Sequence, residues 1–159
     1  MMDELVEVLR NTVNSDTNIV VTGETGVGKT TTMLQLLALN DTTKDFNLMV
    51  YPELRGRETF DILSKMNGGY KLVTTMHAEN AADLPKRLES LLGQHQNFEE
   101  RNAARLVKEF CSNLVHIHIH DAPLHAVMSV SAFRNGQPRE LYTRERTADG
   151  WKISYSDQL

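Results

Sequence analysis

Hydrophobic residues along the chain follow two spacings, one typical of helices and one typical of short buried strands. Near the start, residues 3–13 place apolar side chains at near-helical spacing between polar ones, which predicts a short amphipathic helix. Three later apolar runs, each followed by a helical pattern, predict buried strands. The strands are expected at 18–22, 47–51 and 70–75, and the helices at 29–39, 57–66, 80–92 and 98–112.

The alternation of strands and helices over residues 1–112 predicts an α/β core with a parallel sheet. Strands joined through helices in this order are typical of right-handed crossover units. Pro52 is expected to end the second strand, because proline lacks the amide hydrogen that sheet pairing uses.

The last third of the chain has a different pattern. Turn signals such as the Asn135-Gly136 and Asp149-Gly150 pairs separate short strand-like segments, which is typical of antiparallel strands. The segments are 113–120, 126–133, 140–145 and 151–155. Residues 113–159 are therefore expected to form a β-rich C-terminal meander, as an extension of one domain that spans residues 1–159.

Residues 23–30 read GETGVGKT, directly after the first predicted strand and before a predicted helix. In this context the pattern G-x-x-x-x-G-K-T indicates a phosphate-binding loop, in which backbone amides and the helix N-terminus hold phosphate. Lys29 is expected to neutralise the β- and γ-phosphates of ATP, and the Thr30 hydroxyl to ligate Mg²⁺. A chance match in a strand-to-helix turn is the alternative. The residues predicted to contact nucleotide are Gly23, Glu24, Thr25, Gly26, Val27, Gly28, Lys29, Thr30 and Thr31.

Two polar residues that follow predicted strands are candidates for catalysis beside Lys29. Glu53 follows the second strand, where a carboxylate can orient or deprotonate a water at the γ-phosphate. His77 follows the third strand, at the carboxyl edge of the sheet, where it could sense the γ-phosphate. A surface glutamate that opens a loop and a solvated loop histidine are the respective alternatives.

Composition and charge narrow the function classes. The chain is 40% hydrophobic and 24% charged, and its apolar runs are far shorter than a membrane span. Acidic residues near the N-terminus do not fit a secretory signal, so a cytoplasmic location is expected. A net charge of −4 with scattered basic residues argues against general nucleic-acid binding. The single cysteine, Cys111, cannot form an internal disulfide and is expected to be a buried helix residue.

His116, His118 and His120 alternate along one predicted strand and therefore share a face, with His125 across the following turn. Three imidazoles on one face could bind a transition metal. Because no cysteine or carboxylate ligand flanks them, a polar solvent face is the preferred interpretation, and no metal other than Mg²⁺ is predicted.

Three ordered motifs resemble those of the type II/type IV secretion ATPase superfamily. They are the phosphate loop, residues 52–59 (PELRGRET) and residues 66–80 (MNGGYKLVTTMHAEN). The wording of the last two is most similar to the branch that drives Tad/Flp-type pili and conjugation machines. The resemblance covers roughly residues 15–145.

The resemblance implies a RecA-like core that assembles into a ring, hexameric in the family. Such a ring uses ATP to power pilus assembly or substrate export at the cytoplasmic face of the inner membrane. Its implied partners are therefore ATP or ADP, further copies of the chain, and inner-membrane secretion or pilus components. Glu53 matches the catalytic glutamate of the family's Walker B segment, His77 matches the His-box histidine, and Arg55 and Glu58 match the stretch after Walker B.

Two differences from the family imply a compact form that lacks the N-terminal domain. Only one predicted helix precedes the phosphate-loop strand, and only residues 40–46 stand where the family has strands with an acidic Asp box. Two functions follow. The first is an ATP-hydrolysing motor subunit of a secretion, pilus-assembly or conjugation system. The alternative is a nucleotide-dependent interaction module, with little or no turnover, that docks on a secretion ATPase.

Overall fold

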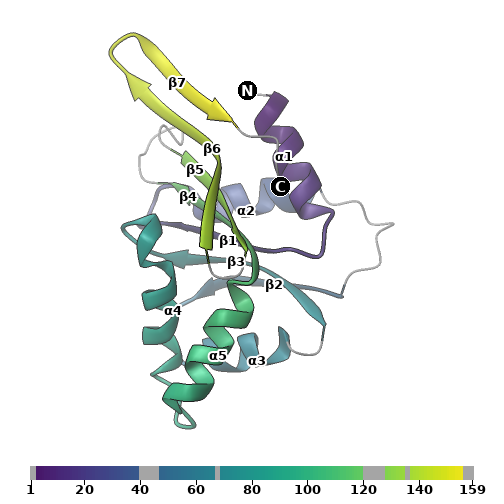
Figure 1. Ribbon diagram of the computed structural model, residues 1–159, viewed down its shortest axis with the longest axis vertical. Coiled ribbons are helices and arrows are strands. Elements are labelled where there is room, and N and C mark those ends of the chain that lie inside the picture. Colours follow the sequence, from purple (N-terminus) through teal and green to yellow (C-terminus); the bar gives the residue numbers. More distant parts are fainter. Residues whose placement is uncertain (1–2, 40–46, 67–68, 120–127, 135–136, 156–159) are drawn as a thin grey trace.

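The computed structural model describes residues 3–39, 47–66, 69–119, 128–134 and 137–155. Within these residues helices and strands alternate as far as β3, helices alone follow as far as α5, and the rest are strands (Figure 1). The elements are α1 (Asp3–Val13), β1 (Asn18–Gly23), α2 (Lys29–Ala38), β2 (Asn47–Leu54), α3 (Glu58–Met66), β3 (Tyr70–His77), the short 3₁₀ helix η1 (Ala81–Asp83), α4 (Leu84–Leu92), α5 (Glu100–Phe110), β4 (Asn113–Ile119), β5 (Met128–Arg134), β6 (Gln137–Thr147) and β7 (Gly150–Tyr155).

All described strands belong to one sheet with the order β2-β3-β1-β4-β5-β6-β7. The strands β2, β3, β1 and β4 pair in parallel, and β5, β6 and β7 continue the sheet in antiparallel pairs. Every residue of β1 is buried, because helices cover both faces of the sheet at this point. Such double coverage explains why parallel strands read as continuous apolar runs.

The prediction that the antiparallel meander begins at residue 113 is wrong, because β4 pairs in parallel with β1 from Asn18↔Leu114 to Gly23↔Ile119. The chain leaves β3, passes through α4 and α5, and returns on the far side of β1, so β4 is one more crossover strand. The antiparallel part starts one strand later, at β5.

The prediction that Pro52 ends the second strand is also wrong, since β2 continues to Leu54. The pairing with β3 shifts register between Tyr51 and Leu54. Among the described strands β2 is at the sheet edge, where a missing amide hydrogen is tolerated. The hydroxyl of Thr75 donates a hydrogen bond of 2.7 Å to the Pro52 carbonyl and holds the irregular segment against β3.

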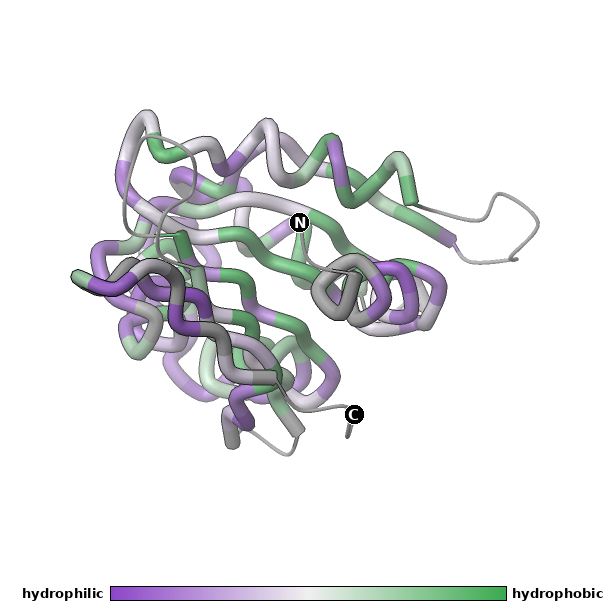
Figure 2. The backbone as a smooth tube through the Cα atoms, turned by 90° about the horizontal axis from the view of Figure 1, so that it is seen from above, coloured by the Kyte–Doolittle hydropathy of each residue, from purple (hydrophilic) through white to green (hydrophobic). Residues whose placement is uncertain are grey.

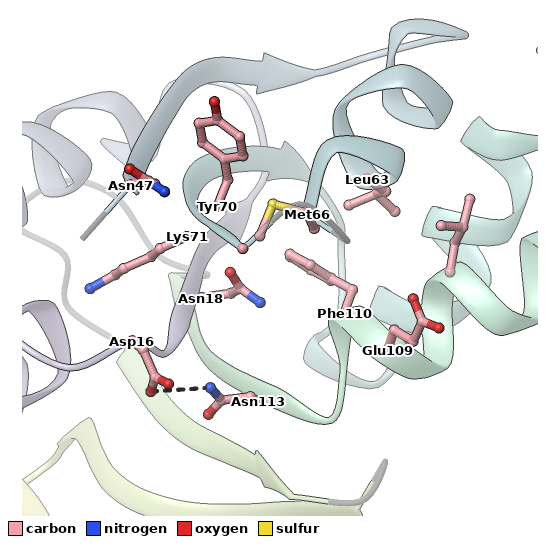
Figure 3. Close-up of a pocket in the computed structure, with 12 residues that line it drawn as sticks. Asp16, Asn18, Asn47, Leu63, Met66, Tyr70, Lys71, Glu109, Phe110 and Asn113 are labelled. Carbon is pink, nitrogen blue, oxygen red and sulfur yellow. Dashed lines mark hydrogen bonds between the residues drawn. The ribbon is translucent and has the colours of Figure 1, made fainter. Parts of the chain in front are cut away.

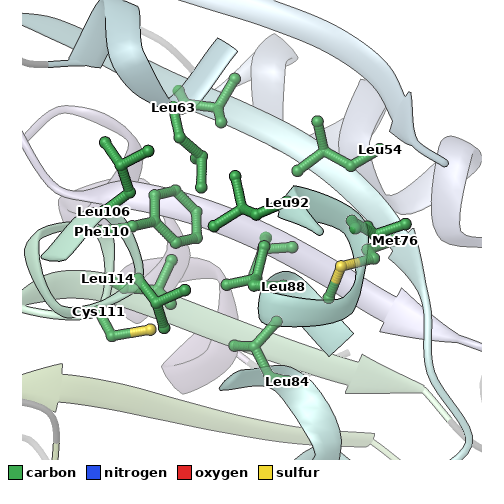
Figure 4. Packing of buried hydrophobic residues seen from close by; sticks show 14 of the residues in the cluster. Leu54, Leu63, Met76, Leu84, Leu88, Leu92, Leu106, Phe110, Cys111 and Leu114 are labelled. Atoms are coloured by element: carbon green, nitrogen blue, oxygen red, sulfur yellow. The ribbon is translucent and has the colours of Figure 1, made fainter. Parts of the chain in front are cut away.

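Two apolar clusters lie on the two faces of the sheet. The first contains side chains from α1 and α2, and the second contains side chains from α3, α4 and α5 (Figure 4). Figure 2 shows hydrophobic residues along the central strands and mixed hydropathy along the helices around them. Helix α4 packs against the sheet through four leucines of the second cluster that are fully buried: Leu84, Leu88, Leu91 and Leu92.

Candidate functional site

The loop between β1 and α2 approaches its neighbours too closely for a side chain at its first position. A Cβ atom on Gly23 would lie 2.4 Å from the carbonyl oxygen of Ile119. Gly26 and Gly28 have φ angles of 83° and 100°, which only glycine adopts readily. Helix α2 begins with no side-chain cap at Gly28, so its first amides have no intrahelical partner and are disposed to bind an anion.

Lys29 is 9% exposed and folds back onto the loop. Its Nζ donates hydrogen bonds of 3.0 Å to the carbonyl of Gly23 and 2.8 Å to that of Glu24. Burial lowers the pKa of Lys29, the charge of Glu53 raises it, and Arg55 lowers it further. The charges of Glu53 and Arg55 therefore both influence the ammonium of Lys29.

Glu53 lies in the irregular end of β2 and pairs with Arg55. The Nε and Nη2 atoms of Arg55 lie 2.7 Å and 2.6 Å from Oε2 of Glu53. The Glu53 side chain is 22% exposed and that of Arg55 is 78% exposed. The carboxylate thus faces the loop from the sheet, and the guanidinium reaches it from the solvent side.

The phosphate loop and Glu53 line one pocket of about 370 Å³ at the carboxyl edge of the parallel strands. The structure therefore brings the predicted residues Lys29, Thr30 and Glu53 together. The lining residues are Thr25, Gly26, Gly28, Lys29, Thr30, Thr31, Glu53 and Arg55.

Four of the predicted site residues do not line this pocket: Gly23, Glu24, Val27 and His77. His77 pairs with Gly23 in the sheet register and is half-buried, beside the pocket. Val27 is 7% exposed, and its side chain belongs to the first apolar cluster, which leaves only its backbone to face a phosphate. Glu24 is exposed and takes part through its carbonyl, which accepts from Lys29.

Arg55 is a site residue that motif spacing alone did not assign. It stands two positions after Glu53, directly after the last residue of β2. Glu58 holds the following turn, because its Oε1 accepts the backbone amides of Arg55 at 2.8 Å and Gly56 at 2.9 Å. The short separation of two opposite charges in the sequence was the available signal for the contact between Arg55 and Glu53.

A protein-family model described as an AAA domain matches residues 12–130. The chain belongs to this AAA domain family. The match contains the phosphate loop, Glu53 and the four parallel strands, so it agrees with the site described above. The predicted fold class, a P-loop α/β core followed by antiparallel strands, is confirmed.

Among solved structures, the AAA domain is similar to the VirB11 ATPase from the Brucella suis type IV secretion system, crystallised in complex with sulphate. The TM-score is 0.64 at 18% sequence identity, and the match covers 96% of this chain and 52% of that chain. This chain therefore spans about half the length of the VirB11 chain. The resemblance to secretion ATPases is thus shown at the level of the fold. No curated protein matches the sequence.

The histidines of β4 do not form the polar solvent face that was predicted. In the AAA domain His116 and His118 are 2% and 3% exposed. They face the α4 and α5 side of the sheet, where the hydroxyl of Thr22 contacts both rings. Strong desolvation, with a smaller effect from His118, lowers the pKa of His116 to about 3. His120 and His125 lie outside the described residues.

A second cavity, of about 250 Å³, lies at the opposite edge of the sheet (Figure 3). It is lined by residues that begin the parallel strands, among them Asn18, Asn47 and Asn113. Lys71, which lines this cavity, donates from its Nζ to the carbonyl of Val13 at the end of α1 and, at 2.7 Å, to that of Ser15 just after it. The cavity is therefore separate from the phosphate loop, which stands at the carboxyl ends of the same strands.

Two further observations concern metals and membranes. No three histidine, cysteine or carboxylate side chains gather as a metal site in the part of the chain that the structure describes. Within that same part, no helix combines the length and the apolar character needed to cross a membrane.

Proposed function

We propose that this chain binds Mg²⁺·ATP on its phosphate loop and hydrolyses it as a motor subunit of a bacterial secretion, pilus-assembly or conjugation system. The observation that carries the proposal is the shared pocket of Lys29, Thr30 and Glu53. A phosphate cradle alone needs no carboxylate opposite it. Hydrolysis does, because a residue must orient or deprotonate the attacking water.

The residues of the loop fit a triphosphate and its metal. Amides at the uncapped start of α2 would hold the β-phosphate, and Lys29 would exchange its two carbonyl contacts for phosphate oxygens. Thr30 is exposed at the pocket, so its hydroxyl is available as a ligand of Mg²⁺. Mg²⁺, when bound, neutralises charge on the phosphate oxygens.

Glu53 would orient the water, and His77 would sense the γ-phosphate from the adjacent strand end. The position of Glu53 is fixed by the Thr75 hydrogen bond to the Pro52 carbonyl. His77 is tied to the loop, because it pairs with Gly23 and the next amide, that of Ala78, donates to the Gly23 carbonyl at 3.3 Å. A change at the phosphate would therefore reach the end of β3 through these contacts.

The motor assignment is supported by the motifs at residues 52–59 and 66–80 together with the fold likeness to VirB11, which its description names as an ATPase of a type IV secretion system. On this basis the chain would act as a ring, hexameric as in the secretion family. It would work at the cytoplasmic face of the inner membrane, in contact with secretion or pilus components.

The decisive experiment measures nucleotide binding and steady-state ATP hydrolysis over a range of protein concentrations, with particle mass in the same buffer. Wild type is compared with Lys29→Ala and Glu53→Gln, and with Lys86→Ala and Glu89→Gln, which change exposed residues of α4. We expect Lys29→Ala to lose binding and Glu53→Gln to bind without turnover, while the α4 variants behave as wild type.

Two results would overturn parts of this proposal. If wild type binds ATP but shows no turnover that depends on Lys29 at any concentration, the chain is a nucleotide-dependent interaction module rather than a motor. If Lys29→Ala binds ATP as tightly as wild type, the assignment of the phosphate loop is wrong.

A further inference from the structure

Arg55 contacts the proposed catalytic carboxylate at the solvent side of the nucleotide pocket. The Nε and Nη2 atoms of Arg55 both contact one oxygen of Glu53, at 2.7 Å and 2.6 Å. Arg55 also lines the pocket with Lys29 and the loop. The guanidinium is therefore bound to a carboxylate in the same pocket where the proposed function puts a γ-phosphate.

We propose that Arg55 is a γ-phosphate sensor that exchanges partners, pairing with Glu53 when no γ-phosphate is bound and with the γ-phosphate when ATP is bound. This inference rests on the proposed function and adds to it a means of telling ATP from ADP. It also links recognition of ATP to the release of the carboxylate that acts on water.

The exchange needs little rearrangement. The Arg55 side chain is 78% exposed, and ion pairs at such exposure contribute little to stability because water competes for both charges. A phosphate oxygen offers the guanidinium a stronger, charge-assisted partner in a fork geometry that arginine fits. Whether Arg55 pairs with Glu53 or with phosphate therefore depends on the presence of the γ-phosphate.

The backbone under Arg55 is fixed, so only its side chain has to move. Glu58 accepts the amides of both Arg55 and Gly56 on one carboxylate oxygen. A Cβ on Gly56 would lie 3.1 Å from Oε2 of Glu58, so the turn and the carboxylate pack closely. Glu58 thus acts as a positioning residue that keeps Arg55 aimed at the pocket.

The ability of Glu53 to act on water depends on whether Arg55 is paired with it. The contacts of Arg55 occupy Oε2 of Glu53, so this oxygen is not available to a water while the pair is intact. Moving the guanidinium to a phosphate would free the oxygen at the moment when ATP is in place. ADP provides no γ-phosphate, so Arg55 would stay on Glu53.

The first test measures the dissociation constants of fluorescent ATP and ADP for the full chain as wild type, Arg55→Gln and Arg57→Gln. Arg57 is the matched control, because it is an exposed arginine two residues away that lines a different cleft. We expect Arg55→Gln to weaken ATP about tenfold, the loss of roughly one charge-assisted contact, with less than about a twofold change for ADP. Arg57→Gln should change neither constant.

The second test separates sensing from simple attraction of phosphate. Removing the Glu53 charge frees Arg55, so Glu53→Gln should strengthen ATP binding at least about threefold, and the gain should vanish in the Arg55→Gln background. Melting temperatures of all variants confirm that each is folded.

The outcomes distinguish this inference from the proposed function. Equal effects of Arg55→Gln on ATP and ADP, or no effect on either, would overturn the sensor while leaving nucleotide binding by Lys29 intact. A gain from Glu53→Gln that persists without Arg55 would also overturn it. If wild type binds neither nucleotide, the proposed function and the sensor fail together.

Discussion

The Oγ1 hydroxyl of Thr22 lies 2.5 Å from Nε2 of His116 on the neighbouring parallel strand. The same hydroxyl lies 2.7 Å from Nδ1 of His118, and all three side chains are buried. Thr22 directly precedes Gly23, the first residue of the phosphate loop. A buried polar cluster therefore joins β4 to the strand that carries the loop, and it sits among apolar side chains where an unmet hydrogen bond is costly.

Replacing Thr22 with valine tests the importance of this cluster. The change keeps the shape but removes the hydroxyl from two buried rings, so we expect a loss of about 1–3 kcal/mol in the free energy of unfolding. Thr74→Val is the matched control. Thr74 is fully buried on the adjacent strand, and its hydroxyl makes one longer bond, 3.3 Å, to the carbonyl of Thr75. Urea unfolding that shows equal losses for both variants would contradict the role of the cluster.

The buried imidazole of His116 makes stability depend on pH below neutrality. Its pKa is about 3 in the folded chain and 6.5 as an ordinary value, so between these values the unfolded chain binds a proton that the folded chain does not. Stability then falls as pH falls from 6.5 toward 3, by up to about 1.4 kcal/mol per pH unit from this group.

We expect His116→Gln to flatten that pH dependence, because glutamine keeps a polar group near Thr22 without titrating. The measurement is the free energy of unfolding of wild type and variant at pH 7, 6, 5 and 4. His95→Gln serves as the control, since His95 lies at the surface cleft lined by Arg57 and Asp61. Parallel curves for wild type and His116→Gln would show that His116 is protonated in the folded chain.

The local elements and the phosphate loop could be predicted from sequence because their signals are local. The glycine pattern at 23–28 reports backbone conformations, and the apolar runs report burial on both sheet faces. The parallel direction of the strands up to β3 could be predicted from their alternation with helices, whereas their order in the sheet was not predicted.

The incorrect predictions about β4 concern features that depend on contacts between residues far apart in the sequence. A strand that alternates histidine with valine and isoleucine has the same pattern whether its polar side faces water or a buried partner. The hydroxyl of Thr22, 94 positions from His116, is such a buried partner. The pairing of β4 with β1 likewise depends on where α5 returns the chain. The short separation of Arg55 and Glu53 in the sequence was a signal for their contact. The direction of the Arg55 side chain also depends on Glu58, which holds the turn.

Gly23→Ala should damage the fold and the site together. The added methyl would lie 2.4 Å from the Ile119 carbonyl and 2.7 Å from a Val27 methyl, and backbone on one side leaves it little room. We expect a loss of about 1–3 kcal/mol, as for overpacked cores, with weaker nucleotide binding as the loop shifts.

Gly150→Ala is the control for Gly23→Ala. Gly150 also has a positive φ, 124°, but an added Cβ there meets nothing within 4 Å. Its unfolding free energy should fall through backbone strain alone, with nucleotide affinity unchanged. Equal nucleotide affinities for wild type and Gly23→Ala would show that the loop tolerates the methyl.

Cys111 should be unreactive in the folded chain. It is 4% exposed, and burial raises the pKa of its thiol to about 11, so only about 0.1% is thiolate at pH 8. Ellman's reagent should therefore modify wild type slowly at pH 8 and rapidly in denaturant. Ser112→Cys places a second thiol at the next, exposed position and should react at once with one equivalent. Rapid reaction of native wild type would show that the end of α5 opens readily.

Lys71 connects the end of α1 to β3 of the sheet by hydrogen bonds, and its replacement by methionine should weaken the attachment of that helix. The side chain is 4% exposed, and its Nζ donates to the carbonyls of Val13 at 2.5 Å and Ser15 at 2.7 Å, where a positive charge also favours the end of a helix. Burial lowers the pKa of Lys71 to about 8, and the charge of Asp16 opposes this effect, so the ammonium persists at pH 7.

We expect Lys71→Met to lower the free energy of unfolding by about 2 kcal/mol, as for the loss of a hydrogen bond to a charged group. Amide exchange should become faster in α1 before it does in β1. Lys86→Met, at an exposed position of α4, should change neither quantity. Exchange that speeds equally in α1 and β1 would show that Lys71 supports the whole sheet rather than this one attachment.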